Sequence, residues 1–331
     1  MAEAVAQCDA AIDALALLAG ERRSTAPVLE QLGALAAAVT RSGLAGAHAR
    51  RRNAVHLVTG WLRSDDEAVL DAASAVLAAL SQDSLTPRTY TFHKSGVSLR
   101  LTDGSRCDGG LGWRPWRGAL VLADLLPALI PGHRVLELGA GLGLAGLVAA
   151  KLGAASVVLT DSVPALSAAQ ADNVAQNGLE AVVRVTHLDW DDAEPCTACH
   201  EAECVIGSDV VYGGEHADAL PRVLAAHIAQ PGGWALLVNG VRFPDVLRRF
   251  LDNLPGAGLS AEVALLPSDA PMDVSITDEN GAVSTGDLGD VSVTLHALPH
   301  LVTLVWHATS ERPQLTFPGL PQWTPAREWA S

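Results

Sequence analysis

The chain has 331 residues, of which 22 are Lys or Arg and 37 are Asp or Glu, so its formal net charge at pH 7 is −15. This length suffices for one α/β domain of ordinary size together with a smaller appendage. A strongly negative chain repels phosphate backbones, so the charge argues against nucleic acid and favours a cationic partner. Many proteins are acidic only to remain soluble, and that explanation serves equally well.

Apolar residues make up 49% of the chain but form no membrane-spanning run. The longest apolar stretch, 119–130, contains Asp124 and Pro127 and is shorter than the roughly 18 residues that a spanning helix needs. The first twenty residues carry three acidic residues and no Lys or Arg, which is the reverse of a secretion signal or a transit peptide. The 5 cysteines are odd in number and unevenly spread, so they indicate reduced thiols. We expect a cytoplasmic or nuclear protein.

Residues 1–86 are expected to form an all-helical N-terminal region. Over residues 2–81, apolar residues such as Leu15 and Leu18 recur at three- and four-residue intervals, which predicts four short amphipathic helices. The expected breaks between helices are at Gly20, Pro27, Gly43 and Ser64. No motif here carries chemistry, and a helical appendage of this kind more often binds a partner or stabilises the protein than catalyses a reaction.

Residues 87–331 are expected to form an α/β domain that begins with a β-hairpin, residues 89–92 and 97–101, around a Lys-Ser-Gly turn. From Trp116 onward, helix-like and strand-like stretches alternate, which is typical of a Rossmann-like parallel sheet with helices on both faces. The seven expected strands are residues 134–138, 156–160, 182–187, 204–208, 234–239, 261–266 and 301–306. An acidic stretch with Gly and Ser, residues 267–290, is expected to be a mobile surface loop.

A glycine-rich turn follows the first expected strand and precedes a helix, with the sequence Glu137-Leu138-Gly139-Ala140-Gly141-Leu142-Gly143. Glycines let a ligand approach the backbone closely, and a helix start offers free N–H groups. Asp161, at the end of the second strand, is placed to accept hydrogen bonds from the ribose hydroxyls of an adenosine. These features fit either NAD or S-adenosylmethionine, and a tight turn without a ligand is the plain structural alternative.

Further polar and aromatic residues follow the third and fourth strands, where ligands bind in open α/β sheets. They are Leu188-Asp189-Trp190 and Ser208-Asp209-Val210-Val211-Tyr212. Together with Trp116, the glycine turn and Thr160-Asp161, this ordered set resembles the family-16 seven-β-strand (class I) S-adenosylmethionine-dependent protein-lysine methyltransferases. Each motif is weak by itself, but their order across about residues 89–306 is specific.

The resemblance implies S-adenosyl-L-methionine as the cofactor and methyl transfer to a lysine of a non-histone protein, such as elongation factor 2 or a chaperone. An additional N-terminal helical segment resembles the enzymes that modify elongation factor 2 more than the compact enzymes that modify chaperones. The resemblance implies that Trp116 closes over the cofactor, that Asp161 holds the ribose and that Trp190 stacks against the adenine. The other cofactor-binding residues that it implies are Glu137, Gly139, Ala140, Gly141, Asp189 and Ser208.

The resemblance also implies that Asp209 and Tyr212 face the incoming lysine as the catalytic pair. Methyl transfer from a sulfonium to an amine is an in-line displacement, so the protein must mainly align the reacting atoms. We expect Asp209 to orient the ammonium and Tyr212 to pack on the alkyl stem; a helix cap and a wall residue are their alternative roles. Arg117 stands where the family usually has an acidic or small residue, which raises the question of whether cofactor binding is weakened.

Other functions explain less of the sequence. An NAD-dependent oxidoreductase accounts for the glycines and Asp161 but leaves Trp190 and Tyr212 unexplained. Base-methylating enzymes of this fold carry Pro-Pro-Tyr after the fourth strand, where this chain has Val-Val-Tyr, and the charge also argues against nucleic acid. A methyltransferase acting on a small molecule and a non-catalytic scaffold that binds S-adenosylmethionine remain open.

A cysteine cluster, Cys196-Thr197-Ala198-Cys199-His200 with Cys204, contains the C-x-x-C-H pattern of haem attachment and of some zinc sites. A second C-x-x-C and a secretion signal are both missing from the sequence, so we expect no metal. We expect a monomer with a protein substrate and with no nucleic-acid or membrane partner.

Overall fold

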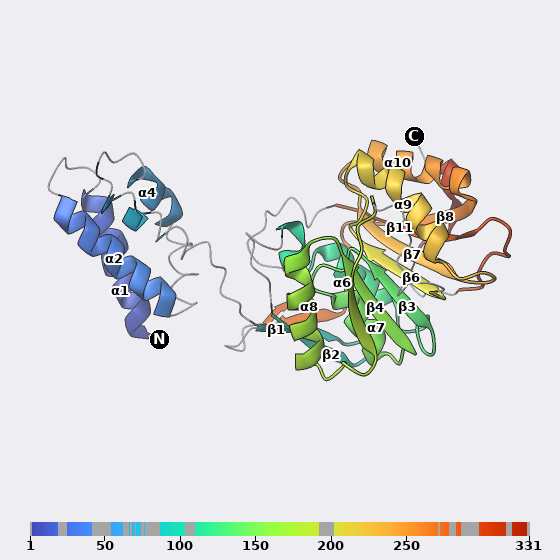
Figure 1. The fold of residues 1–331 in the computed structure, drawn as a ribbon, viewed down its shortest axis with the longest axis horizontal. Coiled ribbons are helices and arrows are strands. Elements are labelled where there is room, and N and C mark those ends of the chain that lie inside the picture. Colours follow the sequence, from blue (N-terminus) through green and yellow to red (C-terminus); the bar gives the residue numbers. More distant parts are fainter. Residues whose placement is uncertain are drawn as a thin grey trace. The chain divides into compact units, whose positions relative to one another are not determined.

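The computed structural model describes residues 2–18, 25–41, 54–61, 66, 68–69, 71–73, 76, 87–102, 110–191, 202–270, 272–277, 283–285, 298–315 and 320–329. The chain divides into two compact units, with the boundary between Thr86 and Pro87 (Figure 1). Among the described residues, no helix is both long enough and apolar enough to cross a bilayer.

The first unit contains the helices α1 (Ala2–Leu18), α2 (Thr25–Arg41) and α4 (Ala54–Trp61), which share one apolar core. The fully buried members of that core include Cys8, Leu15, Leu32, Leu35 and Val58. The break expected at Pro27 is wrong, because this proline lies in the first turn of α2, where its missing N–H would have no partner within the helix. The other expected breaks, Gly20, Gly43 and Ser64, lie outside the described residues.

The second unit is built on an eight-stranded sheet with the order β12-β8-β11-β7-β6-β3-β4-β5. Its strands are β3 (Arg134–Leu138), β4 (Ser156–Asp161), β5 (Val183–His187), β6 (Cys204–Ser208), β7 (Trp234–Gly240), β8 (Leu259–Leu266), β11 (His300–His307) and β12 (Thr324–Pro325). The strands from β3 to β7 are parallel, and β11 runs antiparallel to both β7 and β8. The predicted Rossmann-like sheet and all seven predicted strands are confirmed, and the short β12 adds an edge.

The central parallel strands could be predicted because helices cover both faces of the sheet, so that strands such as β6 and β7 consist mainly of buried apolar residues. One apolar cluster includes residues of α6 (Arg117–Leu125), α7 (Leu144–Lys151) and α8 (Pro164–Gln176). A second cluster includes residues of α9 (Gly214–His227) and α10 (Pro244–Asn253). Every residue of β7 and β11 is buried between these layers (Figure 1).

A separate four-stranded sheet has the order β10-β9-β1-β2. The predicted hairpin is present as β1 (Pro87–Phe92) and β2 (Val97–Thr102). The expectation of a loop throughout residues 267–290 is wrong, because β9 (Val274–Thr277) pairs antiparallel with β1 and β10 (Val283–Thr285) pairs with β9. The side chains of Val274 and Ile276 are buried in the core beside the hairpin, which is what fixes this strand.

The chain order of the strands also fixes where a ligand can enter. From β3 the chain proceeds outward to β4 and β5, then returns to the other side of β3 to form β6 and β7. The connections therefore diverge between β3 and β6, and open α/β sheets bind ligands at such a switch point, beyond the carboxyl ends of the strands.

Candidate active site

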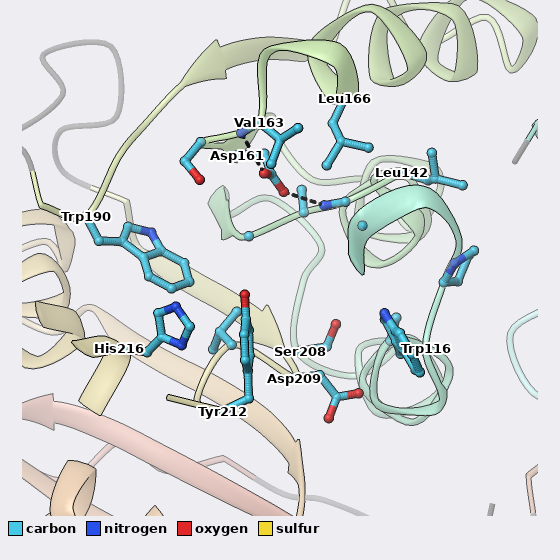
Figure 2. Close-up of a pocket in the computed structure, with 18 of the residues that line it drawn as sticks. Trp116, Leu142, Asp161, Val163, Leu166, Trp190, Ser208, Asp209, Tyr212 and His216 are labelled. Carbon is cyan, nitrogen blue, oxygen red and sulfur yellow. Dashed lines mark hydrogen bonds between the residues drawn. The ribbon is translucent and has the colours of Figure 1, made fainter. Parts of the chain in front are cut away.

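A cavity of about 530 Å³ lies beyond the carboxyl ends of β3, β4 and β6. It is lined by all the predicted site residues except Glu137, namely Trp116, Gly139, Ala140, Gly141, Asp161, Asp189, Trp190, Ser208, Asp209 and Tyr212. These residues come from five separate segments of the chain, so the fold brings the ordered motifs together in one place (Figure 2).

The glycine turn forms one wall of the cavity and requires its glycines. Gly139, Gly141 and Gly143 have φ values of 58°, 55° and 84°, a left-handed conformation that other residues rarely adopt. A Cβ atom at Gly139 would also lie 3.0 Å from Val210 Cγ1 and 3.3 Å from the Trp190 ring. The turn therefore keeps its backbone open to the cavity while packing closely against its other neighbours.

Asp161 is fixed at the end of β4 by the backbone on both sides. Its Oδ2 accepts a hydrogen bond from the Gly141 N–H at 3.0 Å, and its Oδ1 accepts one from the Val163 N–H at 3.1 Å (Figure 2). Burial raises the pKa of this carboxyl, and the backbone hydrogen bonds oppose that shift. Because a carboxylate oxygen can accept two hydrogen bonds, both oxygens keep capacity for hydroxyl donors in the cavity.

Glu137 is the one predicted cofactor-binding residue that does not reach the cavity. Its side chain lies in the buried layer under the turn, where Oε2 accepts a hydrogen bond from the Gly146 N–H at 2.8 Å. Full burial raises its pKa to about 8. The predicted cofactor contact is corrected accordingly: Glu137 anchors the first turn of α7 to β3 and supports the glycine turn from behind.

Three rings form a continuous aromatic wall on the other side of the cavity (Figure 2). The centroid of the His216 ring lies 5.5 Å from that of Trp190, nearly perpendicular to it, and 4.2 Å from that of Tyr212. Tyr212 remains 42% exposed, and burial together with the negative charges of Asp161 and Glu215 raises its pKa. We did not predict His216; the signal was a ring four residues after Tyr212 at the start of a helix.

Two arginines flank Trp116 at the opposite end of the cavity. The guanidinium carbon of Arg242 lies 5.0 Å from the centroid of the Trp116 ring, and that of Arg114 lies 5.9 Å from it. Arg242 Nη2 also lies 3.9 Å from Asp209 Oδ1. We predicted neither arginine from the sequence. Arg242 follows β7, about thirty residues after Tyr212, and Arg114 lies two residues before Trp116 but belongs to no motif that carried the resemblance.

Asp209 lines the cavity, but its carboxylate is held by the protein. Oδ1 accepts a hydrogen bond from the Gly240 N–H at 2.9 Å, and Oδ2 accepts one from the Gly118 N–H at 3.3 Å. A Cβ atom at Gly118 would lie 2.5 Å from Oδ2, so the carboxylate is wedged against the start of α6. The backbone at Asp209 is left-handed, with φ 51°, and the side chain points toward Trp116 (Figure 2). This differs from the expected orientation toward a substrate amine.

Arg117 does not line the cavity, although its identity departs from the family pattern. Its Nη2 donates hydrogen bonds to the carbonyl oxygens of Ser268 and Ala270, at 3.3 and 3.4 Å, and so ties α6 to the segment after β8. Burial lowers the pKa of its guanidinium. The Arg117 side chain therefore points away from the region where a cofactor would bind.

The described residues contain no group of three His, Cys, Asp or Glu side chains arranged to hold a metal ion. Cys204 is a free, buried thiol in β6, and burial raises its pKa well above the usual value. The other members of the cysteine cluster, Cys196, Cys199 and His200, lie outside the described residues.

The donors and walls of this cavity fit S-adenosylmethionine. The Trp190 indole offers an apolar surface for an adenine, the Asp161 carboxylate offers acceptors for ribose hydroxyls, and the backbone of Gly139 and Gly141 lines the cavity where the methionine portion would lie. A cavity of this volume also lies within the range usual for small-molecule sites.

A family model described as lysine methyltransferase matches residues 110–254. Protein N-lysine methyltransferase METTL21A of Danio rerio is 37% identical over 185 residues, which cover 54% of this chain and 82% of that protein. Protein-lysine N-methyltransferase EEF2KMT of Homo sapiens is 29% identical over 191 residues, covering 51% of this chain and 58% of that protein. Methyltransferase-like protein 22 of Mus musculus is 46% identical over 95 residues, covering 26% and 24%.

Among solved structures, P. horikoshii TYW2 in complex with MeSAdo is 16% identical, with a TM-score of 0.41, and the match covers 65% of this chain and 69% of that one. The family assignment rests on the sequence relatives. Because the zebrafish enzyme is matched over most of its length at 37% identity, this chain belongs to the lysine methyltransferase family.

Proposed function

We propose that this chain transfers a methyl group from S-adenosylmethionine to a lysine side chain of a non-histone protein. The observation that supports this most directly is the meeting of Asp161, Trp190 and Tyr212 with the glycine turn around one cavity. An NAD-dependent oxidoreductase would use the turn and Asp161, but that function would not explain the three rings of the aromatic wall. Membership in the family of protein-lysine methyltransferases supports the same reaction.

Different residues around the cavity bind different parts of the cofactor in this proposal. We assign the ribose hydroxyls to Asp161, which its two backbone hydrogen bonds hold in place. Trp190 provides the surface for the adenine, with Asp189 next to Trp190 in the chain, and the segment Gly139–Gly141 faces the methionine portion. Ser208 contacts the cofactor elsewhere along the cavity. Trp116 closes the end of the cavity at which the two arginines lie.

When bound, the cofactor would supply a methyl group carried on a sulfonium sulfur. The substrate lysine must first release its ammonium proton to water, because only the neutral amine has the lone pair that accepts the methyl group. The protein has little acid–base work to do in such a displacement and contributes by holding the reacting atoms in line. Tyr212, half-exposed at the cavity mouth, provides a wall for the lysine stem. Asp209, which follows β6, fixes the start of α6 and the end of β7 through its two backbone hydrogen bonds.

Elongation factor 2 and chaperones are the first substrates to test, because the resembling enzymes modify them. We place the reaction in the cytoplasm or the nucleus, and we propose that the chain acts as a monomer. The net charge of −15 suits a lysine-bearing partner and opposes binding of nucleic acid.

The test has two arms. Calorimetry with S-adenosylmethionine and with NAD separates a methyltransferase from an oxidoreductase, and we expect binding of the former alone. Incubation with methyl-labelled S-adenosylmethionine and a whole-cell extract, followed by mass spectrometry of the labelled band, then identifies the modified lysine. Binding of the cofactor without transfer to any protein would favour the scaffold or small-molecule alternatives over the proposed function.

A further inference from the structure

The charged side chains around the cavity are not equivalent. Its carboxylates belong to Asp161, Asp189, Asp191, Asp209 and Glu215. A substrate lysine brings a positive charge into the cavity, so the carboxylate that receives it must face the opening and must not already be balanced by a protein cation.

The carboxylate of Asp209 does not meet this requirement. Both of its oxygens accept backbone N–H groups, and the Arg242 guanidinium lies 3.9 Å away. A lysine ammonium placed there would stand beside another positive charge. The side chain of Asp209 is also only 11% exposed, so few routes reach it from the opening.

Asp161, Asp189 and Asp191 lie on the side of the cavity assigned to the cofactor. The Asp161 oxygens are aligned by Gly141 and Val163 toward the ribose position. Asp189 and Asp191 flank Trp190, and Asp189 Oδ1 accepts a hydrogen bond from the Asp191 N–H at 3.0 Å. We assign these three acids to the adenosine of the proposed cofactor, so they are not available to the incoming lysine.

Glu215 remains, and its surroundings suit a cation. It lies in the first turn of α9, lines the cavity, and keeps 69% of its side chain exposed. Among the described residues its nearest ion-pair partner is His216 Nε2, at 3.8 Å, which carries charge only when protonated. A Cβ atom at Gly213 would lie 2.2 Å from Glu215 Oε1, so the carboxylate folds back over the chain that leads to Tyr212.

An acid in the first turn of a helix also stabilises the helix through its dipole, and that effect accounts for the residue type. It does not account for the place of the carboxylate on the cavity wall, next to the adjoining rings of Tyr212 and His216, which are tilted by 57° to each other. Aromatic faces pack against the alkyl stem of a lysine and attract its ammonium, and a carboxylate at the end of such a wall completes the site.

We infer that Glu215, rather than Asp209, receives the ammonium of the substrate lysine, with its stem packed on the Tyr212 and His216 rings. This inference rests on the proposed function of the same cavity. Glu215 thus acts as a substrate-binding residue that draws the ammonium into the cavity. The ammonium then releases its proton to water, the neutral amine accepts the methyl group, and no bond to Glu215 forms during transfer.

The first test compares Glu215→Gln, Glu215→Asp and the wild type in methyl transfer to the protein band labelled in a cell extract. Asp218→Asn is the matched control, because Asp218 lies on the same helix, is exposed, pairs with Arg249 and does not line the cavity. We expect Glu215→Gln to slow transfer about tenfold or more, since a charge-assisted hydrogen bond is lost. Glu215→Asp should retain part of the rate, and the affinity for S-adenosylmethionine should stay within about twofold in every variant.

The second test uses n-butylammonium as a probe for the lysine side chain, detected by saturation-transfer NMR on the protein saturated with S-adenosylhomocysteine. We expect a signal with the wild type and with Asp218→Asn, and its loss with Glu215→Gln. Neutral n-butanol serves as the uncharged control and should respond equally to all three proteins.

Equal transfer rates and equal butylammonium signals in the wild type and Glu215→Gln would overturn the inference while leaving the proposed function intact. A wild-type chain that labels no protein contradicts the proposed function instead, and the probe measurement then decides the inference by itself. Because Glu215 is largely exposed, its substitution should not unfold the protein, and matching thermal transitions of the variants verify this.

Discussion

The Asp161 carboxylate accepts a hydrogen bond from the Gly141 N–H at 3.0 Å and so joins the end of β4 to the glycine turn after β3. This contact links two motifs that lie about twenty residues apart in the sequence, as ribose-binding acids do in nucleotide sites. It orients an acceptor and the glycine turn toward the same cavity, which is the geometry that an adenosine-containing ligand needs.

Replacing Asp161 with alanine should weaken binding of S-adenosylmethionine. The ribose hydroxyls lose their acceptor and the turn loses its anchor, so we expect the dissociation constant to rise at least tenfold, or about 1.4 kcal/mol. Calorimetry measures this directly. Asp172→Ala, an exposed acid on α8, is the control and should leave the affinity unchanged; an equal loss in both variants would mean that net charge, and not Asp161, governs binding.

Replacing Asp209 with alanine should destabilise the protein. The change leaves the N–H groups of Gly118 and Gly240 without their acceptor and removes the carboxylate beside Arg242, so we expect a loss of about 2–3 kcal/mol in the free energy of unfolding. Urea denaturation provides the measurement. Asp209→Asn keeps an oxygen acceptor and tolerates the left-handed backbone, so it should lose less. Full stability of the alanine variant with abolished transfer would instead restore Asp209 as the residue that orients the amine.

Replacing Arg117 with alanine should leave cofactor affinity unchanged, because the side chain points to Ser268 and Ala270 and not into the cavity. We expect a small loss of stability, about 0.5–1.5 kcal/mol, from the two hydrogen bonds. The pair of measurements is calorimetry and thermal unfolding, with the exposed Arg184→Ala as control. Tighter cofactor binding in Arg117→Ala would show that this departure from the family pattern does weaken the site.

Glu137 should make stability depend on pH. Burial raises the pKa of its carboxyl from 4.5 to about 8, so in this interval the folded state holds a proton that the unfolded state has released. The folded state binds more protons than the unfolded one, and the contribution of this group to stability therefore falls as the pH rises from about 4.5 to about 8, and levels off above that.

Glu137→Gln removes this titration while keeping an oxygen for the Gly146 N–H. Urea denaturation at several pH values between 5 and 8 should show the glutamine variant gaining stability relative to the wild type as the pH rises. A difference between the two proteins that stays constant across this range would contradict a raised pKa at Glu137.

The sheet was predictable because its central strands are covered on both faces, and strands such as β7 and β11 are consequently buried along their whole length and rich in apolar residues. The strand β9 was missed because its four residues lie among Gly, Ser and acidic residues that resemble a loop. Its pairing with β1 is a long-range contact that local patterns do not encode.

The site residues that could be predicted were also those marked by local sequence patterns. The glycine turn, Asp161 and Trp190 belong to short motifs at strand ends, and we could predict them from the sequence. Arg242 reaches the cavity only through the packing that follows β7, so no motif signalled it, and the spacing of His216 from Tyr212 at the start of α9 was a signal that we did not use. The direction of the Asp209 carboxylate depends on a left-handed backbone and on two backbone N–H groups from distant segments, neither of which sequence spacing reveals.

A crystal structure of the protein with S-adenosylhomocysteine tests the proposed cofactor site itself. We expect electron density for the compound in the cavity, with its ribose hydroxyls within hydrogen-bond distance of Asp161 and its adenine against Trp190. Density at another place on the protein, or an adenine remote from Trp190 with the ribose away from Asp161, would contradict it.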